Sequence, residues 1–432
     1  MKIVHAADLH IDSPLLGLTR YESAPVDRLR GATRRAFENL IELCLEEHAG
    51  LLLIAGDVFD GDWRDYSTGL FFAAQLARLR HAGVHVVLIA GNHDAQSHIT
   101  RELRLPENVR VLATRKPETV LFEELGVAVH GQGFAARDVS DDLAARYPLA
   151  VNGVFNIGLL HTALGGRIGH APYAPTSLEV LRTRGYDYWA LGHIHTREVV
   201  SLEPLTIFPG NLQGRHARET GEKGATVLTV RDGRVVEHRH EALDTVRWAV
   251  CEVDVCDAIS GDDVVQLARK SLSEAAAHAD GRLLAARIEL IGATRAHAAI
   301  LREPEKWTAE LRAMSLDLGQ GDVWLERVKV LTRPVEQSLA GFDLAAREDA
   351  LGQLVAQIER LVDDPSVLAP LAATFADLKR KLPAQLTEGE PLFDGLARDR
   401  PLLRLDEPDY VASLLPEVKE LLLARLGEGE GS

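Results

Sequence analysis

Residue types that bind metal ions occur at five places in this chain, each directly after a short apolar run. The five places are Asp8 with His10, Asp57, Asn92 with His93 and Asp94, His161, and His193 with His195. An apolar run of four to eight residues between turn signals is typical of a buried strand. Ligand groups of open α/β sheets gather just beyond the carboxyl ends of the strands. The sequence therefore predicts that these side chains converge on a metal centre.

The spacing within each group indicates how the ligands are shared between ions. Asp8 and His10 are alternate residues, which point to the same side of an extended chain, and His193 and His195 repeat this geometry. Asp57 follows a glycine, where a carboxylate could bridge two ions. Two ions about 3.5–4 Å apart clamp the attacking and leaving oxygens of a phosphoryl displacement. The predicted ligands are Asp8, His10, Asp57, Asn92, His161, His193 and His195.

The chemical types of the predicted ligands limit which metal ions and which class of substrate the site could bind. All the predicted donors are nitrogen or oxygen and none is a thiolate, which suits Mn²⁺, Fe or Zn²⁺ without choosing among them. Two divalent ions with the carboxylates of Asp8 and Asp57 leave a formal charge of about +2, because bound ions dominate the local field. A phosphate ester is therefore favoured over a neutral peptide or sugar.

Three neighbouring residues are predicted to act on protons or orientation. His93 is not needed to complete either ion, and we assign it to protonating the leaving oxygen or stabilising the pentacoordinate state. A carboxylate such as Asp94 could fix the ring of His93. Asp60, three residues after Asp57, is placed to orient the ligands without binding the metal itself. Each of the 17 histidines, taken alone, is better explained as an ordinary surface or core residue than as a metal ligand. The prediction therefore depends on the five places occurring together.

Length and composition bound the class of protein. The 432 residues predict about two to three domains, and 46% hydrophobic residues allow ordinary cores. No apolar stretch reaches the roughly 18 residues of a membrane span, and a strand from Lys2 leaves no room for a signal peptide. Cys44, Cys251 and Cys256 have no metal-finger or disulfide spacing. We expect a reduced cytoplasmic protein that makes no membrane contact.

The negative charge is unevenly distributed. A net charge of −16 argues against a generic nucleic-acid binder, which would usually show a basic face. Residues 334–432 hold 19 acidic and 10 basic residues, a net of −9. We therefore expect this last segment to have a different role from the rest of the chain.

Three segments follow from the patterning, with boundaries at 1–243, 244–333 and 334–432. The first alternates strands with amphipathic helices expected at Val26–His48, Thr68–His81 and Ser177–Arg184. It ends in strands at Thr206–Phe208, Ala225–Val230 and Arg234–His240, the last two joined by the hairpin signal Asp232-Gly233.

The second and third segments carry no cluster of ligand types. Residues 244–333 form a small α+β unit with strands at 247–255, 282–291 and 323–331 and helices at 261–278 and 306–314, which we interpret as a cap. Residues 334–432 contain helices expected at 342–362, 366–382 and 408–426, without a visible shared core. We interpret this last segment as a partner-docking region.

The ordered ligand set resembles that of the calcineurin-like metallophosphoesterase superfamily, over about the first 200 residues. The resemblance implies a two-sheet α/β/β/α sandwich, here followed by the small α+β cap and the helical C-terminal tail. It places Asp8, His10, Asp57 and His195 on one ion. It places Asp57, Asn92, His161 and His193 on the other, with His93 as the catalytic acid.

Within that superfamily the chain is similar to the SbcD/Mre-type DNA exonucleases and to their YhaO branch. The segments that carry this similarity are Met1–His5, Gly61–Tyr66, Gly91–Asp94, Tyr173–Pro175, Tyr186–His193 and Phe208–His216. The similarity implies an Mn²⁺-dependent double-strand exonuclease or endonuclease subunit acting in DNA repair. It also implies an SbcC-like ATPase partner with a long coiled coil near which the tail docks, and it leaves a homodimer open.

Contact with DNA would have to come from local basic residues. The candidates are Arg28, Arg30, Arg34 and Arg35 on the helix after the first ligand strand, and Arg215 and Arg218 near Pro209-Gly210-Asn211. Basic residues beside a phosphodiesterase centre commonly position the nucleic-acid backbone. The alternative is a solvated helix face with ordinary surface ion pairs.

Two other functions stay open on the sequence alone. One is a small-molecule phosphodiesterase or phosphatase that uses the same metal site, and the other is a scaffold that mainly binds the ATPase. A hydrolase of small esters has no use for the helical tail, which argues against the first. The intact ligand set argues against the second as a sole role.

Overall fold

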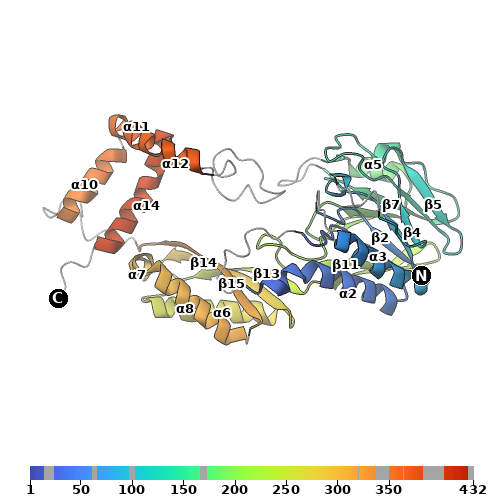
Figure 1. The fold of residues 1–432 in the computed structure, drawn as a ribbon, viewed down its shortest axis with the longest axis horizontal. Helices are drawn as coiled ribbons and strands as arrows, with labels where there is room; N and C mark the ends of the chain where they lie inside the picture. The colour runs from blue at the N-terminus through green and yellow to red at the C-terminus, as the bar shows by residue number, and fades with distance from the viewer. Residues whose placement is uncertain are drawn as a thin grey trace. The chain divides into compact units, whose positions relative to one another are not determined.

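The chain divides into two compact units, which are described separately. The computed structural model describes residues 1–13, 24–60, 66–96, 103–165, 173–319, 321–335, 350–362, 364–382 and 403–426 (Figure 1). The first unit comprises Met1–Ala249 with Ala279–Ala285, and the second comprises Val250–His278 with Ala286–Ser432. Of the segments that carry the exonuclease resemblance, residues 61–65 lie outside the described residues.

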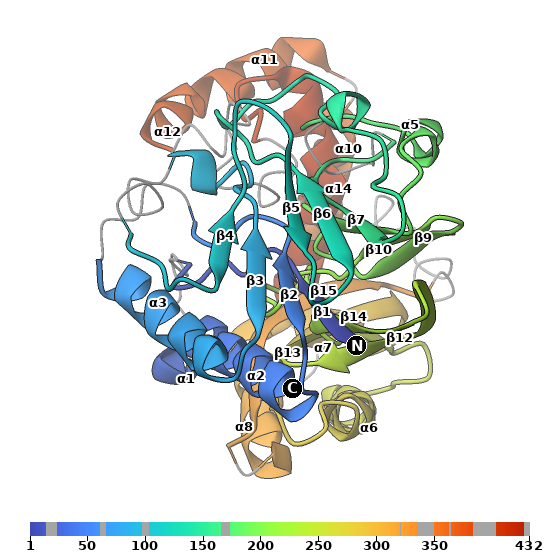
Figure 2. The same ribbon diagram turned by 90° about the vertical axis from the view of Figure 1, so that its right-hand side faces the viewer.

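The first unit contains a six-stranded sheet in which four neighbouring strands are parallel (Figure 2). The parallel strands are β1 (Lys2–Ala6), β2 (Leu51–Ile54), β3 (His85–Leu88) and β4 (Val109–Val111). Strand β11 (Gly224–Arg231) runs antiparallel to β1 and to β12 (Arg234–Ala242). Because β1, β2 and β3 are parallel, the residues that follow them emerge at the same edge of the sheet.

A second six-stranded sheet has the order β5-β6-β7-β8-β10-β9. Its strands are β5 (Glu118–Phe122), β6 (Val127–Gly131), β7 (Phe155–His161), β8 (Tyr188–Gly192), β9 (Glu198–Leu202) and β10 (Leu205–Phe208). Strands β6, β7, β8 and β10 are parallel, and the two edge strands are antiparallel to their neighbours. The carboxyl ends of β7 and β8 therefore also lie at one edge.

Alternating side chains on the strands build the layers. Ile3 packs in a core between the two sheets with residues such as Leu53 and Ile157, whereas Val4 faces the opposite side with Phe37 and Phe72. This alternation is the period of two that a pleated strand imposes. A third core covers the outer face of the second sheet and includes Trp189. The predicted α/β/β/α sandwich is confirmed.

The helices of the first unit follow the predicted segments with small changes. They are α1 (Val26–Arg30), α2 (Ala32–Glu46), α3 (Tyr66–His81) and α5 (Leu178–Thr183). The helix expected at 26–48 is divided at Gly31, a residue type with low helix propensity. Ser177 caps α5 by accepting a hydrogen bond from the backbone N–H of Val180 at 3.3 Å.

Two strand features show where sequence patterns succeed and fail. Asp232 and Gly233 both have positive φ, 48° and 69°, as the predicted two-residue hairpin between β11 and β12 requires. The edge strands β5 and β9 were not predicted, because their side chains are largely exposed or half-buried and form no continuous apolar run. The short strands β4 and β6 were also missed.

The second unit has a three-stranded sheet with helices. Its strands are β13 (Val246–Asp254), β14 (Leu283–Ala293) and β15 (Val323–Arg333), and its helices are α6 (Gly261–Ala277), α7 (His297–Arg302) and α8 (Pro304–Gly319). A capping box between Ser260 and Asp263 begins α6. Helix α7 was not predicted. Since β13 starts within the first unit, the boundaries at 243 and 333 stay a prediction.

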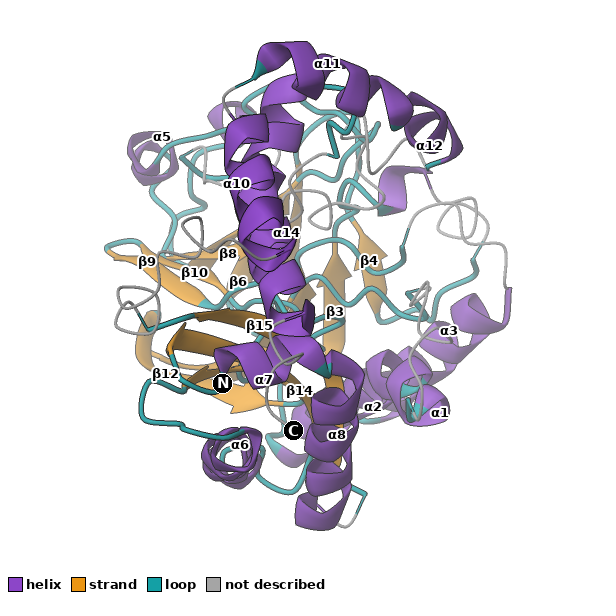
Figure 3. Cartoon of the chain, turned by 90° about the vertical axis from the view of Figure 1, so that its left-hand side faces the viewer, coloured by secondary structure: helices purple, strands orange, loops and turns teal. Residues whose placement is uncertain are grey.

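The helices near the C-terminus share a small core, which the sequence pattern had not revealed (Figure 3). They are α10 (Ala350–Val362), α11 (Pro365–Thr374), α12 (Ala376–Lys381) and α14 (Pro408–Leu426). Residues 342–349 of the expected first helix lie outside the described residues. The core joins α10, α11 and α14 through Ile358, Leu368, Ala372, Val411 and Leu415.

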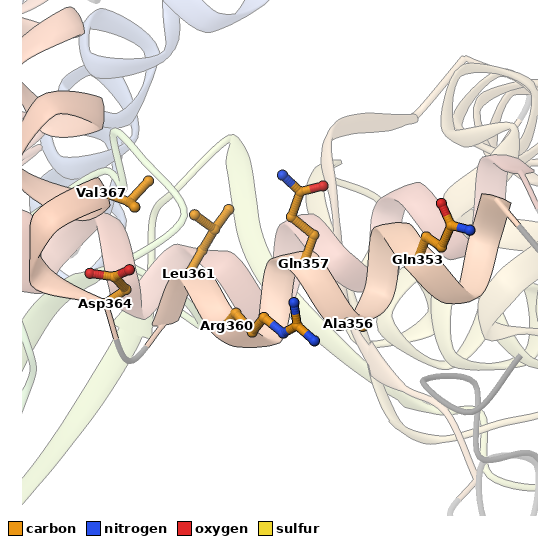
Figure 4. A pocket seen from close by; sticks show the side chains of 7 residues that line it. All are labelled: Gln353, Ala356, Gln357, Arg360, Leu361, Asp364 and Val367. Atoms are coloured by element: carbon orange, nitrogen blue, oxygen red, sulfur yellow. The ribbon is translucent and has the colours of Figure 1, made fainter. Parts of the chain in front are cut away.

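A groove runs along α10 to the start of α11 (Figure 4). It is lined by Gln353, Ala356, Gln357, Arg360, Leu361, Asp364 and Val367. This lining contains one carboxylate and no histidine, so the groove is unrelated in chemistry to the predicted metal centre. No helix within the described ranges combines the length and the apolar character that crossing a membrane requires.

Candidate metal centre

Four predicted ligands sit at sharp backbone turns immediately beyond strand ends. Asp8, His10, Asp57 and His193 have φ values of 52°, 44°, 52° and 98°. Residues other than glycine rarely adopt positive φ, and such strain persists only where the surrounding structure enforces it. Here the backbone turns shortly after β1, β2 and β8 end. The ligand side chains are thereby brought to the edge that the two sheets share.

Glycines next to these turns allow two close approaches, one between the two sheets at Gly192 and one between neighbouring loops of the first sheet at Gly91. A Cβ atom on Gly192, at the end of β8, would lie 1.9 Å from the carbonyl oxygen of Ala55, just beyond β2. A Cβ atom on Gly91 would lie 2.1 Å from Oδ1 of Asp57. Both distances are far below contact, so any other residue at these positions would push the ligand loops apart.

One group of candidate ligands consists of Asp8, His10 and His195, whose ligand atoms lie within 4.8 Å of one another. The Nε2 atoms of His10 and His195 are 3.3 Å apart, and Nε2 of His195 is 3.8 Å from Oδ1 of Asp8. Asp8 and His10 are fully buried, while His195 retains some exposure. The structure thus brings together three of the four ligands expected for the first ion.

The second group consists of Asp8, Asp57 and His161. Nε2 of His161 is 2.9 Å from Oδ1 of Asn92 and 3.4 Å from Oδ2 of Asp57. The ring of His193 lies beside that of His161, with centroids 5.1 Å apart. Asp8 belongs to these two groups, and a third group consists of His10, Asp60 and His93. The resemblance implies that Asp57 bridges the two ions, and this role of Asp57 stays a prediction.

The histidine tautomers test whether a cation fits these groups. Nδ1 of His161 donates to the carbonyl oxygen of Ala55 at 2.9 Å, and Nδ1 of His195 donates to Oε1 of Glu219 at 2.7 Å. With these protons on Nδ1, Nε2 of His161 faces Oδ1 of Asn92, and Nε2 of His195 faces Nε2 of His10. When the rings carry no second proton, these atoms are acceptors that converge on one another, an arrangement that a divalent cation stabilises.

The electrostatics of the buried groups agree with a site for positive charge. Burial alone would lower the pKa of His161, but the carboxylates of Asp57 and Asp8 outweigh this and raise it to about 9. Burial raises the pKa of Asp8 to about 6, although His195 and His161 oppose that rise. The buried carboxylates therefore give the pocket a negative charge that neutral imidazoles do not compensate. Either protons on the imidazoles or bound metal ions can supply the positive charge.

His93 is oriented by Asp60. Nδ1 of His93 lies 2.8 Å from Oδ1 of Asp60, and the same oxygen is 3.5 Å from Nδ1 of His10. Burial would raise the pKa of Asp60, but the nearby imidazoles of His10 and His93 outweigh it and hold the pKa well below its usual range. Asp60 is thus a stable carboxylate that favours a proton on His93.

Asp94 has a different role from the one expected. Its Oδ2 accepts hydrogen bonds from the backbone N–H groups of Val58 and Gly91, both at 3.1 Å, and its Oδ1 accepts one from Phe59 at 3.0 Å. We therefore correct the expectation that Asp94 fixes the ring of His93. Its carboxylate instead ties the loop after β2 to the loop after β3.

The structure gives Glu219 and Arg215 roles that the sequence pattern does not predict. Glu219 was not singled out, yet its buried carboxylate orients His195. Arg215 was expected to contact DNA, but its guanidinium lies 3.4 Å from Oδ2 of Asp60 and 3.3 Å from Oε1 of Glu219. The available signal was a charged run in the loop between β10 and β11, which does not follow an apolar strand.

The other basic residues proposed to contact DNA differ in their exposure. Arg34 makes an ion pair with Asp12 and lies over the ring of Phe71. Residues 28, 30, 35 and 218 are exposed arginines. Contact of those four with DNA stays a prediction.

Comparison with protein families finds two matching segments. Residues 1–197 match the calcineurin-like phosphoesterase family, and residues 248–333 match the middle domain of the metallophosphoesterase YhaO. The first match contains all seven predicted ligands and His93. The second covers most of the three-stranded sheet and its helices.

Individual relatives agree with both matches. An uncharacterized metallophosphoesterase YhaO of Bacillus subtilis is 37% identical over 278 residues, which is 63% of this chain and 68% of that protein. The DNA double-strand break repair protein Mre11 of Methanopyrus kandleri is 27% identical over 45% of this chain and 44% of its own length. A component of the nuclease SbcCD of Rhodobacter capsulatus is 35% identical over 30% of this chain and 27% of its own length. The chain therefore spans less than half of the latter two proteins.

Proposed function

The chain belongs to the calcineurin-like metallophosphoesterase family, as a relative of YhaO, and from this premise we propose that it cleaves phosphodiester bonds of DNA. The family implies a metal-dependent phosphoester hydrolase. The finer assignment to DNA is supported by similarity to proteins named as Mre11 and as a component of the nuclease SbcCD. We propose that the reaction serves DNA repair and that Mn²⁺ is the preferred ion.

The observation that carries the proposal is the convergence of donors from both sheets. We propose that Asp8, His10, Asp57 and His195 hold one ion and that Asp57, Asn92, His161 and His193 hold the other. Two bound divalent ions would supply Lewis-acid activation of the phosphate and a nucleophile at neutral pH. The fit is supported by the inward-facing Nε2 atoms of His161 and His195, whose Nδ1 protons are committed to Ala55 and Glu219.

The protein's own contribution to proton transfer would come from His93. Because Nδ1 of His93 pairs with Asp60, proton transfer to the leaving oxygen would use Nε2. The His93 side chain is 17% exposed, enough to meet a substrate, whereas that of His10 beside it is 1% exposed. A positioned acid of this kind contributes about 10²–10⁴-fold to the rate.

The most direct test of the nuclease activity compares wild-type protein with the His93→Ala variant. In the presence of Mn²⁺, we expect wild-type protein to degrade linear duplex DNA at least about 10²-fold faster than the variant. The variant should keep about two metal ions per chain by elemental analysis. Equal rates on DNA would remove the nuclease proposal, and loss of both ions would show that the role of His93 was misassigned.

A chromogenic phosphodiester separates DNA from small diesters as the substrate. A nuclease should show a kcat/KM on duplex DNA that exceeds the value on the small diester, because the long substrate offers extra binding energy. The opposite preference would favour a small-molecule phosphodiesterase. Negligible hydrolysis of both substrates by metal-loaded wild-type protein would favour a scaffold.

We further propose that residues 334–432 dock on an SbcC-like coiled-coil ATPase. A homodimer of this protein is compatible with the proposal. The shared core of α10, α11 and α14 supports this, since it gives the tail a structure of its own. Truncation before Pro334 should abolish co-purification with such an ATPase and spare activity on the small diester. Retained co-purification would contradict the docking role.

A further inference from the structure

One guanidinium group lies between the two carboxylates that support opposite halves of the candidate metal centre. Nη1 of Arg215 is 3.4 Å from Oδ2 of Asp60, and Nη2 is 3.3 Å from Oε1 of Glu219. The side chains of all three residues are at most 12% exposed. Arg215 therefore joins two acidic groups that come from different parts of the first unit.

The first of these carboxylates leads to the proton donor. Asp60 follows β2, and its Oδ1 faces Nδ1 of His93 at 2.8 Å. Its Oδ2 accepts a hydrogen bond from Oγ of Ser13 at 2.5 Å and faces Arg215. The carboxylate thus has one oxygen for the imidazole and the other for groups that fix its rotation.

The second carboxylate leads to a metal ligand. Oε1 of Glu219 accepts the Nδ1 proton of His195 at 2.7 Å. Its Oε2 accepts hydrogen bonds from Nδ2 of Asn211 at 3.0 Å and from the backbone N–H of Arg215 at 2.7 Å. Arg215 therefore contacts Glu219 through both its backbone and its side chain.

The shape of the Arg215 side chain explains how one residue reaches both carboxylates. A guanidinium has a planar fork of donors that can serve two acceptors at once, which an ammonium group cannot do in the same fixed geometry. With Asp60 and Glu219 both in reach, this fork can pair with both carboxylates at once.

We propose that Arg215 is a positioning residue that holds Asp60 and Glu219 together and so sets the orientation of both His93 and His195. The inference rests on the proposed roles of His93 as acid and His195 as ligand. It adds a link from His195 through Glu219, Arg215 and Asp60 to His93. Through this link, one side chain controls both the affinity for a metal ion and the rate of proton transfer.

The test removes the fork while nearly keeping its size. Arg215→Met should lower the affinity for Mn²⁺, titrated alone into metal-stripped protein by calorimetry, by about 10–100-fold. It should also lower kcat on a chromogenic phosphodiester at saturating Mn²⁺ by about 10–100-fold, with little change in KM. Arg215→Lys keeps the charge without the fork, so it should recover at most one of the two losses.

Two further variants assign each loss to one carboxylate. Glu219→Gln should reproduce mainly the loss of Mn²⁺ affinity, and Asp60→Asn mainly the loss of kcat. Combining either with Arg215→Met should cost less than the sum of the single changes, because residues that act through one another are not additive. The matched control is Arg146→Met, which breaks an exposed ion pair with Asp141, and it should change neither quantity.

The outcomes separate this inference from the function on which it rests. If wild-type protein binds Mn²⁺ and hydrolyses the diester while folded Arg215→Met does both equally well, Arg215 is not a positioning residue. Strictly additive double variants would also overturn the link. If wild-type protein neither binds Mn²⁺ nor hydrolyses the diester, the proposed function fails instead. Thermal unfolding of each variant identifies those that do not fold, and Arg215→Lys then carries the test.

Discussion

The two sheets of the first unit bring different chemistry to the candidate metal centre. At the candidate centre, the loops after β1 and β2 place the carboxylates of Asp8, Asp57 and Asp60 beside the imidazole of His10, whereas the ends of β7 and β8 place only imidazoles there, from His161, His193 and His195. The first sheet therefore supplies negative charge and the second supplies neutral nitrogen donors. Two of the three candidate ligand groups combine residues of both sheets, as in the contact from His161 to Asp57, and the third, His10 with Asp60 and His93, lies in loops of the first sheet.

The second unit shows that the same residue types can have a purely structural use. On its sheet, Glu326 pairs with Arg287 at 2.9 Å and Glu289 pairs with Lys329 at 2.7 Å. These carboxylates are neutralised by cations from the neighbouring strand. Of the residues that the structure describes, only those of the first unit form groups suited to a metal ion. The candidate ligands Asp8 and Asp57 instead face the imidazoles of His195 and His161.

The largest expected effect comes from removing charge on the first sheet. Asp57→Asn should lower phosphodiester hydrolysis by about 10³-fold or more, because several kcal/mol of transition-state stabilisation depend on the bound ions. Elemental analysis should also find less bound metal in Asp57→Asn, which changes the first sheet, than in His161→Ala, which changes the second. Equal metal loss from the two variants would break the distinction between a charged and a neutral half.

A smaller effect is expected where the sheets touch. Gly192→Ala places a Cβ atom 1.9 Å from the carbonyl oxygen of Ala55, so the free energy of unfolding should fall by about 3 kcal/mol or more. Denaturant titration measures this quantity. Gly153→Ala is the comparison, since its Cβ meets nothing within 4 Å at φ 81°, and it should cost only about 1–2 kcal/mol. Similar losses would mean that the approach of the sheets is not tight.

A polar link between the sheets predicts a dependence of stability on pH. His5 on β1 accepts from the hydroxyl of Tyr188 at 2.7 Å and donates to the carbonyl oxygen of Leu191 at 3.2 Å, which fixes a neutral ring. Burial lowers its pKa from 6.5 to about 3. The unfolded chain therefore takes up this proton first, and stability falls as the pH drops from about 6.5 toward about 3.

The size of that dependence can be measured against one variant. Between about pH 7.5 and pH 5, His5 should remove about 2 kcal/mol from the free energy of unfolding. His5→Gln keeps a donor and an acceptor without titrating, so its stability should depend less on pH by this amount. Identical pH profiles for the two proteins would show that His5 takes up its proton as readily in the folded state as in the unfolded state.

The smallest effect concerns the exposed arginines beside the first sheet. Arg30 on α1 is exposed, and Arg30→Gln should reduce the salt dependence of duplex binding by about one counterion with little loss of activity. Fluorescence anisotropy across a range of salt concentrations measures this slope. An unchanged slope would leave the helix face as an ordinary solvated surface.

Much of the site could be predicted because its ligands follow buried strands. Asp8, Asp57 and His161 each come after an apolar run, and parallel strands bring their carboxyl ends to one edge. Glu219 could not be found in this way, since it lies in a loop whose pattern contains no strand end. Asp94 was misassigned for a related reason: its neighbour in sequence, His93, is oriented by Asp60 instead.

The sequence by itself determined which residues could bind metal ions, the alternation of strands and helices, and the likeness to metallophosphoesterases. Such features are local, because apolar periodicity and turn residues act over a few positions. Only the tertiary structure decided which carboxylate faces which imidazole. That choice depends on how closely two sheets approach, as Gly192 allows at Ala55, and on the side-chain contacts of loops far apart in the chain, as between Arg215 and Asp60.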